Sequence, residues 1–556
     1  MPNVLTQVRQ AVTQVPDTFR SVRVLREAGL VRLSRPDEMV RSLLVVRRLG
    51  PFAGAAKLAA HRDPDAVGLV DEAGELTFAQ LDRRSNALAR AWRSTGLKSD
   101  DVIGLLCRDH RGFLDSLLAA AKLGARLVLL NTGFAARQLA DVVAREGVAS
   151  IVYDQEFAPL MANLPPDIRR YLAWIDDPDT VPDTSQAPTP EAAAAETTTL
   201  RRLITETDDT DLPLPAEPGG IVLLTSGTTG TPKGAPRQVR SALAAAEFLD
   251  RIPYRRGEAT LIASPLFHAT GLSQLVLQLA LACTTVLARR FDPERVVARI
   301  DRHRCTGLVL VPTMLRRILD LDEETLARYD TSSLRIVFSA GSALSPELGN
   351  RVMKMFGEVL YNLYGSTEVA VATVATPQDW RQAPGTVGRS PVGCRIRLYD
   401  GSGNQITGPD QMGRIFVGSG LAFGGYTGGG TRAEIDGLLD SGDVGHLTTN
   451  GLLFIDGRSD DMIVSGGENV YPGEVENTLV EHEKIKDAAV IGVPDPDFGA
   501  RLKAFVVREP GTGLSAADVR GYVKGHLARF KVPRDVEFID ELPRNPTGKL
   551  LRHKLR

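Results

Sequence analysis

The stretch TSGTTGTPKG, Thr225 to Gly234, combines the residue types that can bind a phosphate group. Gly227, Gly230 and Gly234 allow the backbone to turn tightly, so that amide N–H groups and hydroxyls can converge on one anion. The hydroxyl side chains are those of Thr225, Ser226, Thr228 and Thr229. Because the stretch follows the apolar run 221–224, it predicts a phosphate-binding loop at the end of a buried strand.

The loop differs from a Walker motif, which requires a Lys-Ser/Thr pair that opens a helix. Here Pro232 precedes Lys233 and Gly234 follows it, which favours a mobile loop. The alternative interpretation is a surface turn rich in serine, threonine and glycine. The order of the residues directly after an apolar strand favours phosphate binding.

A second group of chemically useful residues is YGSTE, 364–368, which supplies an aromatic ring, hydroxyls and a carboxylate. Alone it would be an ordinary loop, but SAGSALS, 339–345, precedes it. Together with TSGTTGTPKG, these stretches resemble the acyl-activating, or ANL, superfamily. That superfamily comprises acyl-CoA synthetases, luciferases and the adenylation domains of peptide synthetases. The resemblance extends over roughly 76–549, most of the chain.

The resemblance implies an ATP site built from these motifs. Tyr364 would pack on adenine, Thr367 would contact the α-phosphate, and Glu368 would bind Mg²⁺, a cation that prefers oxygen ligands. Thr225 is a weaker candidate for the same ion, and Thr228 and Lys233 join Glu368 as candidate catalytic residues. The remaining nucleotide-binding candidates are Ser226, Gly227, Thr229, Gly230, Gly341, Ser342, Gly365 and Ser366.

The ribose and the reacting groups have their own candidates. SGDVG, 441–445, keeps Asp443, whose carboxylate would accept the ribose hydroxyls, and Arg458 would reach the ribose or its phosphate. PRNPTGK, 543–549, matches the last signature of the superfamily and assigns Lys549 to catalysis. A lysine there would bring the carboxylate of the substrate and the α-phosphate together although both are anionic. The alternative is a solvated lysine in a basic tail.

CoA, the acid and the hinge are assigned in the same way. SGGENVYP, 465–472, resembles the segment that enters the site for thioester formation, with Gly466 and Gly467 beside CoA, and Asp460 matches the hinge position. PLFHATG, 265–271, resembles the loop at the acyl pocket, so His268 would line that pocket. A buried structural histidine is the alternative.

The elements around the motifs alternate between strand and helix. Thr77 is suited to cap a helix that continues to Trp92, and Pro472 is suited to begin another. Strands are expected at 102–106, 125–130, 150–153, 221–225, 260–263, 285–287, 307–311, 334–339, 488–493, 503–507 and 536–539. Further helices are expected at 113–123, 135–146 and 515–527, with a surface excursion at 176–220. This alternation is typical of mainly parallel sheets covered by helices.

The predicted fold class is therefore α/β. A large N-terminal domain of two helix-covered, mainly parallel sheets plus a smaller β-rich part would precede a small mobile α+β C-terminal domain. The expected divisions are a basic amphipathic N-terminal extension at 1–60, an AMP-binding domain at 61–457 and a mobile lid at 458–556.

Composition excludes several classes of function. A net charge of −2 over 556 residues, without a basic block, argues against nucleic-acid binding. The 4 cysteines lie far apart, which indicates neither a disulfide framework nor a zinc site and fits a reducing cytoplasm. We expect no signal peptide and no transmembrane helix. The sequence leaves the oligomeric state open, a dimer included.

The first sixty residues carry an excess of arginine, and apolar residues dominate 39–48 between arginines. This pattern fits a helix lying on the anionic inner face of a membrane. It also fits a helix packed on the body of the protein with its arginines in solvent. Both interpretations stay open at the level of sequence.

The resemblance to the acyl-activating superfamily implies an ATP- and Mg²⁺-dependent acyl-CoA synthetase, and a medium- or long-chain fatty acid is the expected substrate. The acid and ATP would give acyl-AMP and pyrophosphate, and CoA would then displace AMP. One alternative is an acyl-AMP ligase that passes its adenylate to a carrier protein. Another is a catalytically silent, nucleotide-binding membrane scaffold.

Overall fold

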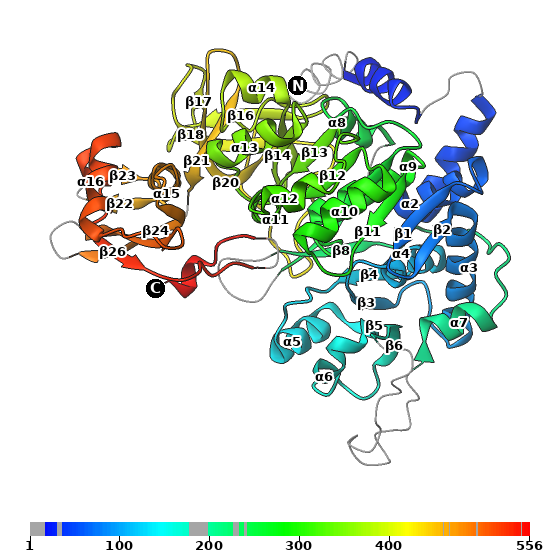
Figure 1. Cartoon of the computed structure of the whole chain (residues 1–556). Coiled ribbons are helices and arrows are strands. Elements are labelled where there is room, and N and C mark those ends of the chain that lie inside the picture. The colour runs from blue at the N-terminus through cyan, green and yellow to red at the C-terminus, as the bar shows by residue number, and fades with distance from the viewer. Residues whose placement is uncertain are drawn as a thin grey trace.

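The structure is a computed structural model. It describes residues 17–30, 36–176, 198–225, 233–237, 242–459, 461–465, 468–495, 499–545 and 548–555. The body of the molecule carries the first part of the chain, and the last part forms a smaller unit at one side (Figure 1). Among the described residues, no helix combines the length and the apolar composition needed to cross a bilayer.

Two mainly parallel sheets form the body, as the strand–helix alternation predicts. The first has the order β15-β14-β13-β12-β10-β11-β1-β2, with antiparallel pairing only at its two edges. Its strands are β1 Val67–Asp71, β2 Gly74–Thr77, β10 Ala259–Ile262, β11 Thr284–Leu287, β12 Gly307–Leu310, β13 Ile336–Ser339, β14 Leu360–Ser366 and β15 Ala370–Ala375. Because the carboxyl ends of parallel strands share one edge, this sheet can gather side chains from distant motifs there.

The second sheet has the order β7-β6-β5-β3-β4-β8-β9. Its strands are β3 Val102–Leu106, β4 Arg126–Leu129, β5 Val148–Asp154, β6 Arg169–Trp174, β7 Thr198–Thr199, β8 Ile221–Thr225 and β9 Lys233–Arg237. All its neighbours are parallel except β8 and β9. The strands are largely buried, which agrees with their near-continuous apolar sequences.

Helices cover these sheets and begin where the sequence has capping residues. Thr77 and Gln80 form a capping box at α3, and Pro472 occupies the first turn of α15, as predicted. The helices are α2 Pro36–Arg62, α3 Phe78–Ser94, α4 Arg111–Leu123, α5 Ala136–Glu146, α6 Ala158–Met161, α7 Leu200–Glu206, α8 Ala246–Leu249, α9 Ala269–Ala280, α10 Pro293–His303, α11 Pro312–Leu319, α12 Glu323–Ala327, α13 Pro346–Phe356, α14 Pro377–Gln382, α15 Pro472–Val480 and α16 Ala516–His526.

The stretch 176–220, expected to be a surface excursion, contains a short helix that packs on the body. Residues 177–197 lie outside the described residues, but α7 follows them and packs against α3. Leu200 and Ile204, one helical turn apart, are buried. Because the surrounding residues are mostly polar, the sequence pattern does not predict this short amphipathic helix.

A third, antiparallel sheet follows the body in the chain, and the C-terminal unit has its own. The third sheet contains β16 Arg395–Tyr399, β17 Gln405–Ile406, β18 Gly413–Gly418, β19 Glu434–Ile435, β20 Leu438–Leu447 and β21 Leu453–Arg458. The C-terminal unit contains β22 Ile463–Ser465, β23 Glu468–Val470, β24 Ile485–Asp495, β25 Gly499–Arg508 and β26 Asp535–Phe538. A separate apolar cluster under α15 and α16 gives that unit its own core.

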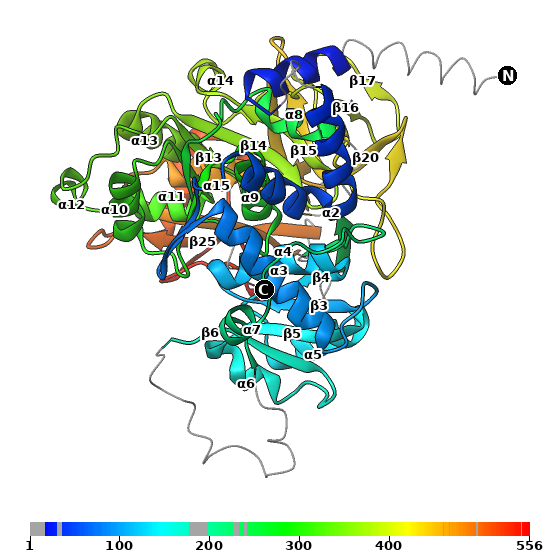
Figure 2. The ribbon, with the colours of Figure 1, turned by 90° about the vertical axis from the view of Figure 1, so that its right-hand side faces the viewer.

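The N-terminal helix α2 belongs to the body. It breaks at Gly50, which has φ 74°, and Pro51 follows the break. The two halves approach each other so closely that a Cβ on Gly54 would lie 2.8 Å from Cα of Val46. The helix packs against α3, α4 and α9 (Figure 2). Its buried residues are Leu49, Phe52, Ala53, Ala55, Ala56 and Ala59.

Charged groups also tie α2 to its neighbours. Lys57 Nζ lies 2.8 Å from Asp82 Oδ2 on α3, and Lys122 Nζ on α4 lies 2.7 Å from Asp82 Oδ1. From Leu49 onward the apolar side chains of α2 therefore face the protein. Within the 39–48 stretch, however, Leu43 and Leu44 are 48% and 54% exposed, so both interpretations of the basic N-terminus stay predictions. Residues 1–16 and 31–35 lie outside the described residues.

Candidate active site

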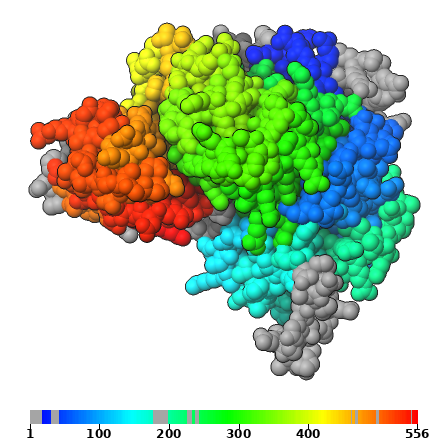
Figure 3. All heavy atoms as spheres, in the orientation of Figure 1, coloured from blue at the N-terminus to red at the C-terminus, as the bar shows by residue number. Residues whose placement is uncertain are grey.

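One cavity of about 1890 Å³ runs between the body and the C-terminal unit and continues into the body. The orange and red C-terminal part lies against the green and yellow part of the body (Figure 3). The predicted site residues that line the cavity are Lys233, His268, Gly341, Ser342, Tyr364, Gly365, Ser366, Thr367, Glu368, Asp443, Arg458 and Lys549. The fold thus brings together motifs that are far apart in the sequence.

The phosphate-loop candidates lie between the antiparallel strands β8 and β9. Thr225 ends β8 and is paired with Lys233, the first residue of β9. This pairing makes the intervening segment a connection between two edge-side strands of the second sheet. Residues 226–232 lie outside the described residues, so the structure does not describe Ser226, Gly227, Thr228, Thr229 and Gly230.

The adenine-side candidates lie at the carboxyl ends of neighbouring parallel strands. Gly341 follows β13 with φ 93°, in the left-handed region that favours glycine. Tyr364, Gly365 and Ser366 form the end of β14, so the YGSTE motif is a strand end and not a plain loop. A Cβ on Gly365 would lie 1.8 Å from the carbonyl oxygen of Ala370, so only glycine fits there.

The ribose candidates form one connected group. Asp443 on β20 and Arg458 on β21 are cross-strand partners, and Arg458 Nη1 lies 3.5 Å from Asp443 Oδ1. Tyr364 Oη donates to Asp443 Oδ2 at 2.6 Å. Burial and the Asp443 carboxylate raise the pKa of Tyr364 well above its ordinary value, so this hydroxyl remains a donor. The group thus presents an aromatic ring, an anion and a cation at one end of the cavity.

Glu368, the candidate metal ligand, is held by two side chains. Ser366 Oγ donates to Oε2 at 3.0 Å, and Tyr426 Oη donates to Oε1 at 2.9 Å. Burial and the Glu368 carboxylate raise the pKa of Tyr426 to about 12. Lys233 Nζ lies 5.2 Å from the centre of the Tyr426 ring, which connects the β9 lysine to this carboxylate. Glu368 lines the cavity, and each of its carboxylate oxygens can accept more than the one hydrogen bond named here, which fits a hard cation such as Mg²⁺.

Lys549 reaches the cavity from the C-terminal loop. Its N–H donates to Asn545 Oδ1 at 2.8 Å, and its carbonyl accepts from the Asn545 N–H at 2.9 Å. The neighbouring Gly548 has φ 74° and lies directly on α11, where a Cβ would come within 2.3 Å of Thr313 Oγ1. The loop is therefore seated on the body, with its lysine in the same cavity as Asp443 and Glu368.

His268 lines the cavity beside a group of apolar side chains, which we call the apolar arm. It precedes α9, and burial lowers the pKa of its imidazole to about 4, so the ring is neutral at physiological pH. Among the residues that the structure describes, Nε2 of His268 has no hydrogen-bond partner. The arm beyond it is lined by Leu272 and Val276 of α9, Leu117, Ala120 and Ala121 of α4, Leu127, Leu223 and, from α2, Leu49 and Phe52.

No sequence motif contains Tyr426, Arg432 or Thr313, which all line the cavity. Arg432 Nη2 lies 3.9 Å from Glu368 Oε1, beside the Tyr426 hydrogen bond. The only sequence signal for Tyr426 and Arg432 is their position in or beside the glycine-rich stretch 424–430. Asp460, Gly466 and Gly467 lie outside the described residues, so the assigned hinge and CoA positions stay predictions.

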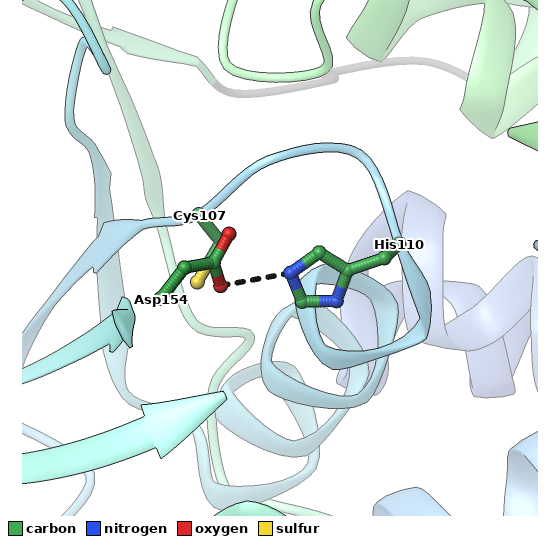
Figure 4. Close-up of side chains that lie close together, drawn as sticks. All are labelled: Cys107, His110 and Asp154. Atoms are coloured by element: carbon green, nitrogen blue, oxygen red, sulfur yellow. Dashed lines mark hydrogen bonds and ion pairs between the residues drawn. The ribbon is translucent and has the colours of Figure 1, made fainter. Parts of the chain in front are cut away.

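A buried cluster of Cys107, His110 and Asp154 lies outside the cavity (Figure 4). The N–H of Gly112 donates to His110 Nδ1 at 3.0 Å, so Nε2 carries the proton and donates to Asp154 Oδ1 at 2.8 Å. Burial raises the pKa of the Cys107 thiol well above its ordinary value. His110 thus caps α4 and connects its start to Asp154 at the end of β5.

Asp109, in the same turn, makes protein stability depend on pH. Its Oδ1 accepts the N–H of Leu266 at 2.9 Å, and burial raises the pKa of its carboxyl to about 8. Between an unfolded pKa near 3.8 and the folded value, the folded protein holds a proton that the unfolded chain releases. Stability should thus fall as pH rises toward 8, by up to about 1.4 kcal/mol per pH unit, and level off above it.

Asp109→Asn should remove this slope, because the amide does not titrate. Denaturant unfolding at pH values from about 5.5 to about 7.5, which lie below the folded pKa of Asp109, would measure how the free energy of unfolding changes with pH. The exposed Asp100→Asn is the matched control and should keep the slope. Equal slopes in the unaltered protein and Asp109→Asn would contradict this assignment.

Comparisons with known proteins agree with this geometry. Residues 57–427 match the AMP-binding enzyme family, and residues 474–549 match the AMP-binding enzyme C-terminal domain. The chain is 31% identical to a fatty acid–[acyl-carrier-protein] ligase from Streptomyces coeruleorubidus, over 89% of this chain and 94% of that protein. It is also 31% identical to a 2-succinylbenzoate–CoA ligase from Bacillus pumilus, over 89% of this chain and 96% of that protein.

A solved structure supports the same relationship. The o-succinylbenzoate CoA synthetase from Bacillus subtilis, in complex with its acyl-adenylate intermediate, superposes with a TM-score of 0.76 at 26% identity. The match covers 90% of this chain and 97% of that one. The chain therefore belongs to the AMP-binding enzyme family of the acyl-activating superfamily and is an AMP-forming, ATP-dependent acid–thiol ligase.

Proposed function

We propose that this protein is an acyl-CoA ligase that activates a medium- or long-chain fatty acid. The observation that carries the proposal is that one cavity is lined by Lys549, by the Tyr364–Asp443 pair and by the apolar side chains of the arm. The nucleotide would lie at the Tyr364 and Asp443 end, and the aliphatic tail would lie in the arm beyond His268. Burial of each methylene in such an arm stabilises binding by about 0.8 kcal/mol, which favours an apolar tail.

The residues of the cavity suit the first chemical step. The carboxylate of the acid must attack the α-phosphorus of ATP, and Lys549 supplies positive charge where the two anions meet. Mg²⁺, when bound at Glu368, would neutralise phosphate charge. Because His268 is neutral, it places no charge beside the apolar arm, which suits a residue that lines the acyl pocket.

The test is a panel of acids with the full-length protein, ATP and Mg²⁺. Pyrophosphate release and acyl-CoA formation would be measured for straight-chain acids from hexanoic to octadecanoic and for aromatic acids. We expect CoA-dependent turnover to be fastest for a straight-chain acid. Turnover confined to aromatic acids would overturn the aliphatic assignment, and acyl-AMP as the sole product with CoA present would overturn the CoA assignment.

A second candidate is transfer of the acyl group to a carrier protein. It is favoured by the relative that is named as an acyl-carrier-protein ligase. A phosphopantetheinylated carrier protein, supplied in place of CoA, would distinguish the two. Faster acyl transfer to the carrier than to saturating CoA would favour this second function.

A further inference from the structure

Part of the apolar lining of the cavity comes from a segment that precedes the matched family region. Leu49, Gly50, Pro51 and Phe52 line the cavity, whereas the family match begins at residue 57. These residues form the break in α2. Part of the wall of the arm is thus supplied by a portion of α2 that the family match does not include.

The break in α2 lies where the helix borders the cavity. Gly50, with φ 74°, interrupts the helix, and Pro51 is suited to begin its second half. Leu49 and Phe52 lie on either side of this turn and are only 3% and 8% exposed. Both belong to the same buried apolar cluster as Leu117 and Leu272, which line the arm from α4 and α9.

The position of the break is fixed from both sides. The close approach of Gly54 to Val46 holds the two halves together, and the Lys57–Asp82 ion pair ties the second half to α3. The backbone of α2 beside Phe52 therefore cannot shift without disturbing a partly buried charge pair and a close backbone contact. A buried aromatic ring in the wall of a close-packed apolar pocket limits the space that a tail can fill.

We propose that the break in α2 is a specificity-determining element, in which Phe52, with Leu49, sets the length of the acyl tail. This inference rests on the proposed function and adds to it the residues that limit the substrate. A tail that reaches Phe52 gains about fourfold in affinity per buried methylene, and a longer tail must displace the ring. A smaller side chain at position 52 shifts the preference toward longer acids, and a larger one shifts it toward shorter acids.

The experiment compares the full-length protein with Phe52→Ala, Phe52→Trp and the control Leu44→Ala. Leu44 lies on the same helix, is 54% exposed and does not line the cavity. The first readout is kcat/KM for straight-chain acids from hexanoic to octadecanoic. The second is the affinity for acyl-sulfamoyl-adenosines of the same chain lengths, which mimic acyl-AMP and need no turnover.

Phe52→Ala should raise the ratio of kcat/KM for the longest acid to that for the preferred acid by about tenfold, and Phe52→Trp should lower it. The affinities should shift in the same directions, and Leu44→Ala should match the unaltered protein. If Phe52→Ala does not fold, Phe52→Leu makes the same test with a smaller change in volume.

The outcomes separate the two proposals. An active protein whose chain-length profile and affinities are the same in both Phe52 variants would overturn the role of α2 and leave the proposed function intact. A protein that forms no acyl-CoA from any acid of the panel would overturn the proposed function, and this inference with it.

Discussion

Replacement of Lys549 by alanine is expected to slow acyl-AMP formation by about a hundredfold or more and to spare thioester formation. The seated C-terminal loop places Lys549 in the cavity that contains Asp443 and Glu368. Its charge matters where carboxylate and α-phosphate meet, and loss of one such contact typically costs about a hundredfold or more. Attack of a thiol on preformed acyl-AMP brings no two anions together, so this step does not need the lysine.

The measurement separates the half-reactions. Acid plus ATP is supplied in one assay, and synthetic acyl-AMP plus CoA is supplied in another. Lys554→Ala, an exposed lysine outside the cavity, is the matched control and should leave both rates unchanged. Equal losses in both assays of Lys549→Ala would assign Lys549 to closure or folding instead.

The second large effect is expected from Glu368→Gln. The amide keeps the shape of the side chain beside Ser366 and Tyr426 but removes the negative charge that would bind Mg²⁺. A bound metal supplies several kcal/mol of charge stabilisation, so pyrophosphate release should fall on the order of a hundredfold. The Mg²⁺ concentration that gives half-maximal rate should rise as well.

A titration with Mg²⁺ at saturating ATP and acid would measure both effects. Glu434→Gln, an exposed residue on β19, is the matched control. Unchanged turnover with an unchanged Mg²⁺ dependence would show that Glu368 is not a metal ligand. A lower rate with an unchanged Mg²⁺ dependence would point to its hydrogen bonds with Ser366 and Tyr426.

The fold class was predictable because local patterns and global topology agree. The apolar runs at 102–106 and 221–225 are both strands, and Thr77 and Pro472 begin helices as their chemistry requires. The strand character of YGSTE was not predictable. Its Tyr-Gly-Ser end has no apolar alternation, and its pairing with β15 depends on Gly365 fitting against the Ala370 carbonyl.

The candidate site was predictable only where residues occur in motifs. Tyr364, Glu368, Asp443 and Lys549 each stand in a recognisable stretch, and all four line one cavity. Tyr426 stands in none, although its hydroxyl holds Glu368 from 58 residues away in the sequence. Such a contact follows from packing of distant loops, for which spacing along the chain carries no signal.

The Gly548 contact with α11 also restricts what can stand beside Lys549. A Cβ at position 548 would lie 2.3 Å from Thr313 Oγ1, so at this position the loop meets α11 through its backbone alone. Any side chain at position 548 would push the loop away from α11 and carry Lys549 with it. The alignment of Lys549 in the cavity therefore depends on the hydrogen atom that its glycine neighbour has in place of a side chain.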